Sequence, residues 1–289
     1  MKERLDTLLV TRGLVESRER ARRLIMSGNV FINGSLIEKV GSRVPLDCDV
    51  AIKENPLRYV SRGGIKLEKA LESFQADVRG KVALDVGAST GGFTDCLLQH
   101  GAKRVYAVDV GYGQLAWKLR QDPRVITLER NNIRFLSLSE IPEKIDLATI
   151  DVAFISLELV LPVVKQFLGD NGEIIALIKP QFEVGKGEVG KGGVVRDREK
   201  HRQVIIKLIE KARALGLTIK GLIRSPLEGP KGNREFFIHL IPTPALLHEG
   251  GGDHASFLPC GGRLGWGDLE AGQNLMSSVL KELIDEAIQ

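Results

Sequence analysis

The stretch LDVGASTGGFT, residues 84–94, decides the fold because it joins an expected strand to an expected helix through a glycine-rich turn. Glycines lack a Cβ atom, so a ligand can approach the backbone closely, and the free N–H groups at the start of a helix point at it. The spacing is G-x-S-x-G-G, which differs from the G-x-G-x-x-G of dinucleotide-binding turns. The turn therefore predicts a small-ligand site at the end of a strand.

Strands and helices alternate outward from this turn, through residues 81–241. The expected strands are 82–86, 105–110, 125–128, 147–151, 173–178, 217–223 and 235–241. The expected helices are 92–100, 113–120, 157–168 and 197–215. This alternation predicts a Rossmann-like α/β fold, with a mostly parallel sheet, a late antiparallel strand and helices on both faces. Ligands in such folds bind at the carboxyl ends of the strands.

The acidic residues around the turn indicate the ligand. Asp85 precedes the first glycine by two residues and suits a ligand that bears an amino acid better than a pyrophosphate. Asp109 ends the next strand, where a carboxylate can accept both ribose hydroxyls of a nucleoside. Together they predict an S-adenosylmethionine site, although glycine turns of this kind also occur for packing alone. The candidate cofactor contacts are Asp85, Gly87, Ser89, Gly91, Gly92, Phe93, Asp109 and Asn132.

Asn132 is the least secure of these contacts. It follows the third expected strand, at the height where an adenine edge would lie. Asn131 is adjacent, and turns favour asparagine for conformational reasons. The sequence leaves open which asparagine faces the ligand.

The first 60 residues predict a separate small α+β unit. A helix around Leu5–Leu9 ends at Gly13, and Ser17 can cap a second helix over 18–26. Short strands are expected at 30–32, 36–37 and 50–52. Residues 1–66 hold 13 lysines and arginines against 8 acidic residues, whereas the remainder is nearly neutral. A basic terminal unit favours a polyanionic partner such as nucleic acid.

Three segments of this unit resemble the RNA-binding domain named after ribosomal protein S4. They are RLDTLLV at 4–10, SRERARRLI at 17–25 and GNVFING at 28–34. The resemblance implies an RNA-facing surface made of Arg4, Ser17, Arg18, Arg22 and Arg23. The plainer alternative is that the arginines only solvate a short helix.

Four further motifs supply a lysine and carboxylate set from separate segments. They place Lys66 in SRGGIKL, Asp151 in TIDVAFISL, Lys179 in LIKPQFE and Glu235 in GNREFF. Asp151 and Lys179 end neighbouring expected strands, and Glu235 begins a strand that runs the other way, so these groups should meet at one rim of the sheet. Methyl transfer to a hydroxyl needs an oriented oxygen and a group that handles its proton, which lysines beside carboxylates can provide.

These motifs resemble the FtsJ-type ribose methyltransferases, and residues 1–241 together resemble the TlyA family, described both as rRNA 2′-O-methyltransferases and as haemolysins. The resemblance implies a class I methyltransferase that acts on the ribose of a cytidine in ribosomal RNA or ribosomal subunits. It implies that Lys179 activates or orients the 2′-hydroxyl, that Asp151 and Lys66 tune and position it, and that Glu235 supports them.

The residues alone leave the division of labour open. Lys66 would lower the pKa of Lys179 by repulsion, while Asp151 would raise it, so the group titrates as a unit and the base is not identified. Each residue also has an ordinary alternative. Lys66 could lie on a helix surface beside Lys69, and Asp151 could simply cap the next helix.

Composition narrows the remaining classes of function. The longest apolar stretch, 157–168, is interrupted by Pro162 and Lys165, and the charged N-terminus lacks a secretory pattern, so a cytoplasmic protein without a membrane partner is expected. Three dispersed cysteines predict neither a disulfide framework nor a metal site. A haemolysin-like membrane activity, a small-molecule or protein methyltransferase and a non-catalytic RNA-binding factor are the alternatives. With 5% aromatic residues, recognition through RNA shape and phosphates is expected.

The chain is thus expected to divide into four parts. Residues 1–60 form the RNA-binding domain, 61–80 a linker and the first catalytic helix, and 81–241 the methyltransferase domain. Residues 242–289 form an acidic tail rich in glycine and proline, with a helix over about 271–288. The glycine- and lysine-rich segment 185–193 is expected to be a loop that closes over RNA, or a simple connector.

Overall fold

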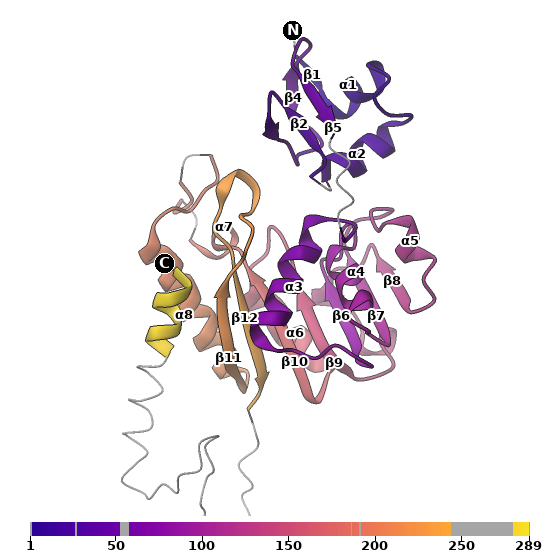
Figure 1. The fold of residues 1–289 in the computed structure, drawn as a ribbon. Coiled ribbons are helices and arrows are strands. Elements are labelled where there is room, and N and C mark those ends of the chain that lie inside the picture. Colours follow the sequence, from indigo (N-terminus) through magenta and orange to yellow (C-terminus); the bar gives the residue numbers. More distant parts are fainter. Residues whose placement is uncertain are drawn as a thin grey trace, which may run out of the picture.

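The computed structural model describes residues 2–26, 28–52, 58–185, 187–190, 192–243 and 280–288. A small N-terminal unit lies next to a larger α/β unit (Figure 1). Each has a hydrophobic core of its own, because the buried residues from Leu5 to Cys48 form one cluster and those of the large unit form two others. No helix within the described ranges is both long and apolar enough to cross a membrane.

The N-terminal unit contains the two expected helices and the expected three-stranded sheet. Its elements are α1 (Leu5–Thr11), α2 (Arg18–Met26), β2 (Val30–Ile32), β3 (Ser35–Leu36) and β5 (Val50–Ile52), with strand order β3-β2-β5. A second antiparallel pair joins β1 (Lys2–Arg4) to β4 (Arg43–Pro45). The sequence did not predict this pair, because strands of three residues rich in charge carry no readable alternation.

The large unit is built on a seven-stranded sheet with the order β11-β12-β10-β9-β6-β7-β8. The strands are β6 (Val82–Val86), β7 (Arg104–Asp109), β8 (Val125–Glu129), β9 (Ile145–Ile150), β10 (Leu168–Ile178), β11 (Leu217–Arg224) and β12 (Phe236–Pro242). Only β12 runs antiparallel to its neighbours, β10 and β11. All seven expected strands and the late antiparallel strand are confirmed.

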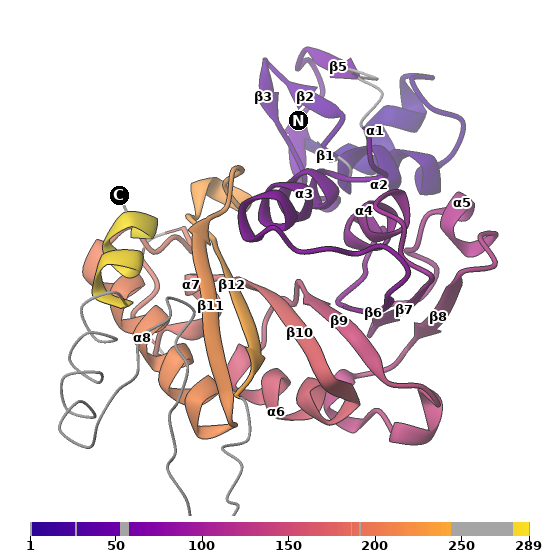
Figure 2. The same cartoon turned by 60° about the horizontal axis from the view of Figure 1, so that its bottom comes forward.

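Helices cover both faces of this sheet (Figure 2). On one face lie α3 (Arg62–Phe74), α4 (Gly92–Gln99) and α5 (Trp117–Arg120), and on the other α6 (Leu157–Phe167) and α8 (Arg198–Ala214). The helix expected over 113–120 begins only at Trp117, because Gly113 adopts φ +71° and Ala116 has an extended ψ of 140°, which leaves residues 113–116 in a loop. A short helix, α7 (Pro180–Glu183), follows β10 and was not expected.

The strand order reverses beside β6, which places a crevice at the carboxyl ends of β6 and β9. Gly87 follows β6 and Asp151 follows β9, and the two backbones touch. A Cβ atom on Gly87 would lie 2.5 Å from the carbonyl oxygen of Asp151, and Gly87 adopts φ +85°. Only glycine permits this approach, so the glycine-rich turn forms the floor of the crevice.

The chain returns to the large unit at its C-terminal end, where a helical segment within residues 280–288 packs beside α8 (Figure 1). Arg202 pairs with Asp285, and Arg234 donates to the carbonyl oxygen of Ile288 at 3.2 Å. The last part of the expected tail helix is therefore present. Residues 271–279, the first part of that expectation, lie outside the described residues.

Candidate active site

The turn after β6 is held in place by Asp109. One carboxylate oxygen accepts from the Ser89 N–H at 2.8 Å, and the other accepts from the Gly111 N–H at 2.7 Å. Ser89 adopts φ +48°, an unusual conformation for serine, which this hydrogen bond stabilises. Each carboxylate oxygen keeps a second lone pair that can accept from a hydroxyl. Asp109 thus shapes the turn and can still bind a ribose.

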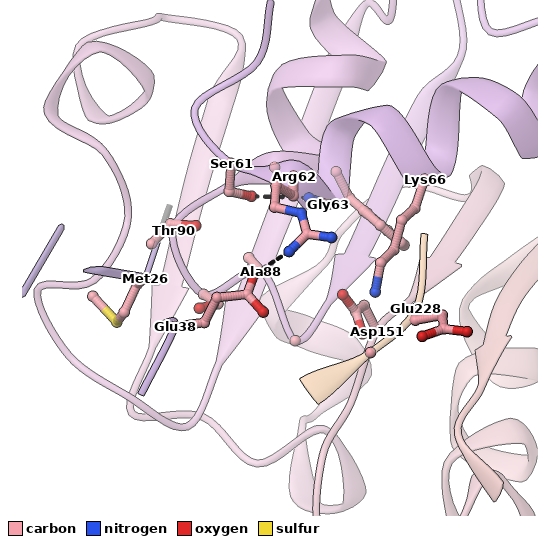
Figure 3. A pocket seen from close by; sticks show the side chains of 15 residues that line it. Met26, Glu38, Ser61, Arg62, Gly63, Lys66, Ala88, Thr90, Asp151 and Glu228 are labelled. Carbon is pink, nitrogen blue, oxygen red and sulfur yellow. Dashed lines mark hydrogen bonds and ion pairs between the residues drawn. The ribbon is translucent and has the colours of Figure 1, made fainter. Parts of the chain in front are cut away.

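Two cavities meet at Gly87, Ser89 and Asp151. The first, about 370 Å³, lies on the β7 side. Its lining includes Gly87, Ser89, Asp109, Asn131, Asn132 and Phe154. The second, about 290 Å³, lies on the α3 side (Figure 3). Its lining includes Ser61, Arg62, Lys66, Gly92, Phe93 and Asp151. The crevice therefore offers two neighbouring compartments that share a wall.

Asp85 differs from its expected role as a ligand contact. It lines neither cavity and is fully buried, which raises the pKa of its carboxyl to about 7. The Thr94 hydroxyl donates to it at 2.6 Å, and the Thr149 hydroxyl lies 3.4 Å away. Asp85 supports the start of α4 from beneath, because its side chain points from β6 into the protein.

Gly91 is also corrected from a ligand contact to a packing position. It precedes α4 with φ +94°, and a Cβ atom there would run into Leu119 and Leu115. It lines neither cavity. The other six expected contacts do line a cavity: Gly87, Ser89, Gly92, Phe93, Asp109 and Asn132.

The four expected catalytic residues form two ion pairs beside the crevice. Lys66 Nζ on α3 lies 2.6 Å from Glu235 Oε2, just before β12. Lys179 Nζ, at the end of β10, lies 2.5 Å from Asp151 Oδ1, at the end of β9. Lys66 and Asp151 point toward one another in the second cavity (Figure 3). The fold thus brings together groups that are up to 169 residues apart in sequence.

The charges of this cluster compensate one another. Burial lowers the pKa of Lys179, but Asp151 and Glu235 outweigh it, so the pKa lies above the ordinary lysine value. Lys66 was expected to lower the pKa of Lys179. This effect is not dominant, because Lys66 is itself paired with Glu235. Burial raises the pKa of Glu235 despite the nearby lysines. Lys179 is therefore an ammonium group at neutral pH in this arrangement.

The ordinary alternatives for these residues do not hold. The Lys66 side chain is only 12% exposed, whereas that of Lys69 is 55% exposed. Ser156, and not Asp151, caps α6 by accepting from the Glu158 N–H at 3.1 Å. The side chains of Lys66 and Asp151 are thus directed to the crevice.

The arginines of the N-terminal unit converge on Asp6, a residue that the sequence analysis passed over. Its side chain is fully buried, and Arg4, Arg18 and Arg22 reach it at 2.9, 2.8 and 3.5 Å. Burial alone would raise the pKa of Asp6, but hydrogen bonds from Arg4 and Arg18 hold it far below its usual value. The only sequence signal was its place in the RLD segment, which identified Arg4 alone.

Ser17 and Arg23 stand apart from this arginine cluster. The Ser17 hydroxyl accepts from the Arg20 N–H at 3.2 Å, which is the role of a helix cap. Arg23 lines a different cavity, of about 270 Å³, with Arg20 on α2 and with Thr90 and Gln114 of the large unit. The expected RNA-facing set is therefore divided: Arg4, Arg18 and Arg22 meet at Asp6, whereas Arg23 faces the large unit.

Two further features of the crevice escaped the sequence analysis. Arg62 at the start of α3 pairs with Glu38 of the N-terminal unit at 2.8 Å, so both units contribute to the second cavity (Figure 3). Phe154 is 91% exposed with φ +64°, and its ring centroid lies 5.0 Å from that of Phe182. Arg62 lies in the quoted segment SRGGIKL and Phe154 in TIDVAFISL, but the ion pair of one and the exposure and backbone strain of the other are visible only in the fold.

A Rossmann-like sheet with a glycine cradle at its switch point and a lysine and carboxylate cluster beside it defines a methyltransferase of the class I type. The FtsJ-like methyltransferase family matches residues 59–241, and the S4 domain family matches residues 3–50. The chain belongs to the FtsJ-like methyltransferase family and carries an N-terminal S4 domain.

Several relatives match most of the chain. The chain is 53% identical to YqxC of Bacillus subtilis, described as an rRNA methyltransferase, over 83% of this chain and 85% of that protein. It is 47% identical to the 16S/23S rRNA (cytidine-2′-O)-methyltransferase TlyA of Mycobacterium tuberculosis, over 82% and 89% of the two chains. A solved structure from Streptococcus thermophilus, described as a hemolysin, is 46% identical with a TM-score of 0.66 and covers 84% and 89% of the two chains.

Proposed function

We propose that this methyltransferase uses S-adenosylmethionine to methylate the ribose 2′-hydroxyl of a cytidine in ribosomal RNA, in the cytoplasm. The observation that carries the proposal is Asp151, which lines both cavities and pairs with the enclosed Lys179 behind it. The activity named for the Mycobacterium tuberculosis relative supports the choice of cytidine and of the 2′-oxygen. The S4 domain supports RNA as the substrate.

The first cavity fits the cofactor. Gly87 and Ser89 form part of its lining, and because Gly87 carries no side chain a ligand can approach the backbone of the turn closely. Asp109 would accept the ribose hydroxyls, and Asn132 or Asn131 would face the base. Gly92 and Phe93, at the start of α4, line the second cavity, and the free N–H groups of a helix start would suit the carboxylate end. When bound, S-adenosylmethionine supplies the methyl group.

The second cavity would receive the target ribose. Lys179 Nζ, an ammonium group, would donate a hydrogen bond to the 2′-oxygen and stabilise the negative charge that develops on it. The Asp151 carboxylate, 2.5 Å from that nitrogen, would take the proton as the oxygen forms its new bond. Lys66, held by Glu235, would keep the cluster electrically balanced. The raised pKa of Lys179 favours this orienting role over that of a free base.

The N-terminal arginines would hold the RNA. Arg4, Arg18 and Arg22 share one buried acid, so each keeps N–H groups of its five-donor guanidinium for phosphate oxygens. Because Asp6 fixes their positions, little conformational entropy is lost when RNA binds. The arginines would therefore provide affinity for RNA, and the crevice would determine which atom is methylated.

The test is transfer of labelled methyl from S-adenosylmethionine to purified small subunits, large subunits and naked rRNA, with the product nucleosides identified by mass spectrometry. We expect 2′-O-methylcytidine in at least one ribosomal RNA. Methylation on a base, or on a protein or small molecule in place of RNA, would overturn the proposal. Cofactor binding without transfer to any of these substrates would leave the fold assignment intact and refute the proposed substrate.

A further inference from the structure

Glu183, the last residue of α7, is a buried carboxylate outside the two ion pairs of the crevice. Its Oε1 accepts from the Leu157 N–H at 2.9 Å, and its Oε2 accepts from the Ser156 hydroxyl at 2.6 Å. Ser156 and Leu157 begin α6. One carboxylate therefore joins α7 to the first turn of α6.

These two helices follow directly from the catalytic strands. Asp151 ends β9 and is five residues from Ser156, while Lys179 ends β10 and is four residues from Glu183. Below the catalytic pair, β9 and β10 are fixed by their parallel ladder, in which Ile150 lies opposite Ala176. Above it, Glu183 fixes the same two segments again. The Lys179–Asp151 pair thus lies between two points of attachment.

The segment between Asp151 and Ser156 needs such an attachment. Phe154 within it adopts φ +64°, a left-handed conformation that is strained for a bulky residue and persists only where the surroundings impose it. The tilted ring contact between Phe154 and Phe182 crosses between the same two segments. Polar and aromatic contacts therefore converge on the loop that carries Asp151.

A cap for α6 alone would not require a remote buried acid. Helix α8 is capped by its own Asp197, which is exposed and accepts from the Glu199 N–H at 2.9 Å. Helix α6 already has Ser156 in that position, yet it also receives Glu183 at 7% exposure. Burying a carboxylate costs free energy unless its hydrogen bonds compensate. Capping of α6 does not require this cost, so the place of Glu183 between the two segments explains the contact better.

We propose that Glu183 is a positioning residue that fixes the spacing of Lys179 and Asp151 by tying α7 to the start of α6. The inference rests on the proposed methyl transfer for its kinetic test but not for its spectroscopic one. Without Glu183 the two segments can separate above the strands. The catalytic nitrogen and carboxylate then lose their fixed distance, although both stay in place in the sequence.

The kinetic test compares Glu183→Ala, Glu183→Gln and the wild type. We expect Glu183→Ala to lower kcat roughly 10- to 100-fold, as misplacement by about 1 Å does, and to leave the KM for S-adenosylmethionine and RNA within about twofold. Glu183→Gln should recover most of the rate, because its amide oxygen can accept from Leu157 N–H and its amide nitrogen can donate to Ser156 Oγ.

The matched control is Glu173→Ala. Glu173 is also a partly buried acid on β10, hydrogen-bonded to His239 and Lys220, but it lies in the middle of the strand, away from its carboxyl end. Its loss should lower the melting temperature and leave kcat unchanged. Equal losses of kcat in Glu183→Ala and Glu173→Ala at equal loss of stability would show that Glu183 acts only through stability and would overturn the proposal.

A second variant keeps the test decisive if Glu183→Ala does not fold. Ser156→Ala removes the 2.6 Å hydrogen bond and leaves the Leu157 bond, so kcat should fall by a smaller factor, and adding Glu183→Gln should lower it little further. In a double-mutant cycle, independent effects of Ser156 and Glu183 would contradict a shared attachment.

The spectroscopic test follows the Lys179 ammonium by nitrogen NMR in ¹⁵N-lysine protein, with Lys179→Met to assign the signal. Asp151 raises the pKa of Lys179. In Glu183→Ala the distance between these two residues is no longer fixed, so the pKa of Lys179 should fall. An unchanged pKa in folded Glu183→Ala, or in Ser156→Ala, would refute the positioning role. A wild type that titrates as expected but methylates no RNA would instead refute the proposed function.

Discussion

The arginines around Asp6 and the lysines of the candidate active site differ in how far they are exposed to solvent. In the S4 domain, one fully buried acid, Asp6, holds Arg4, Arg18 and Arg22, whose side chains stay 43–52% exposed. In the methyltransferase domain the two lysines of the candidate site are enclosed, since the Lys66 and Lys179 side chains are 12% and 14% exposed. Exposed cations attract a polyanion from a distance, whereas enclosed cations act only on a group that enters the crevice.

This difference predicts how each part responds to salt. Exposed charges are screened over about 8 Å at physiological ionic strength, while buried pairs are screened much less. RNA capture should therefore weaken steeply as salt rises, and the chemical step within the bound complex should hardly change. The following variants test the two halves of this contrast, beginning with the largest expected effect.

Replacing Lys179 with methionine should lower kcat by roughly 10²- to 10⁴-fold, the range for a group that handles a proton or developing charge in the transition state. RNA affinity should hardly change, because Lys179 is enclosed and does not reach the exposed surface. Single-turnover rates and filter binding measure the two quantities. Lys69→Met, on the exposed side of α3, is the control and should retain full activity.

A loss of RNA affinity in Lys179→Met as large as its loss of kcat would contradict the contrast between the two parts. It would show that the enclosed lysine contributes to capture. A rate that stays within a few-fold of the wild type would remove Lys179 from the catalytic set.

Phe154→Ala should lower kcat/KM for RNA by roughly 5- to 150-fold if the exposed ring stacks on a base, since such stacking is worth about 1–3 kcal/mol. The ring lies on the edge of the cofactor cavity and is 91% exposed. The cofactor Kd, measured by calorimetry, should change much less. Phe135→Ala removes another exposed ring, outside both cavities, and should have little effect.

Much of the fold was readable from the sequence because the central strands carry continuous apolar runs between clear turns. The strand ends then placed Lys179 and Asp151 correctly, since parallel strands share one edge. Asp85 and Gly91 lie in the segment that the sequence predicted, but the segment alone does not show which way each residue faces. Asp85 points into the core, and Gly91 packs on α5.

Other features depend on contacts between distant segments, which spacing does not encode. Asp6 on α1 gathers arginines from β1 and α2, and Glu183 reaches from one helix to another 26 residues away. Phe154 is an ordinary aromatic residue in the sequence, and only the fold shows that it is exposed at the crevice. The lysine and carboxylate cluster could thus be predicted from the sequence, whereas the contacts of Asp6, Glu183 and Phe154 could not.

Removing Arg18 and Arg22 together should weaken RNA binding and reduce the slope of log affinity against log salt by about 2, because each phosphate contact contributes about one unit. Cofactor binding and the single-turnover rate at saturating RNA should stay at wild-type values. Affinities across a salt series measure the slope. The control replaces Lys211 and Arg213, in the last turn of α8, which changes net charge equally and should leave the slope nearly unchanged.

Asp6→Asn gives the smallest expected effect and the sharpest test of what organises the exposed arginines. It adds one unit of positive net charge, so if charge alone governed capture, RNA affinity would rise. We expect affinity to fall by a few-fold instead, because Arg4, Arg18 and Arg22 lose the acid that orients them. Asp47→Asn, an exposed acid in the same domain, makes the same change in charge and should raise affinity slightly.

The same variant has a pH signature in stability. Arginine contacts hold the pKa of Asp6 far below its unfolded value of about 3.9, so the charged carboxylate stabilises the fold above that pH. This stabilisation is lost as the pH falls through the folded pKa. Asp6→Asn should therefore lower the melting temperature by a few degrees at pH 7, and the gap to the wild type should narrow below about pH 4. A gap that is constant from pH 7 to pH 2 would mean that Asp6 contributes packing and not charge, and the buried acid would then have no part in presenting the arginines to RNA.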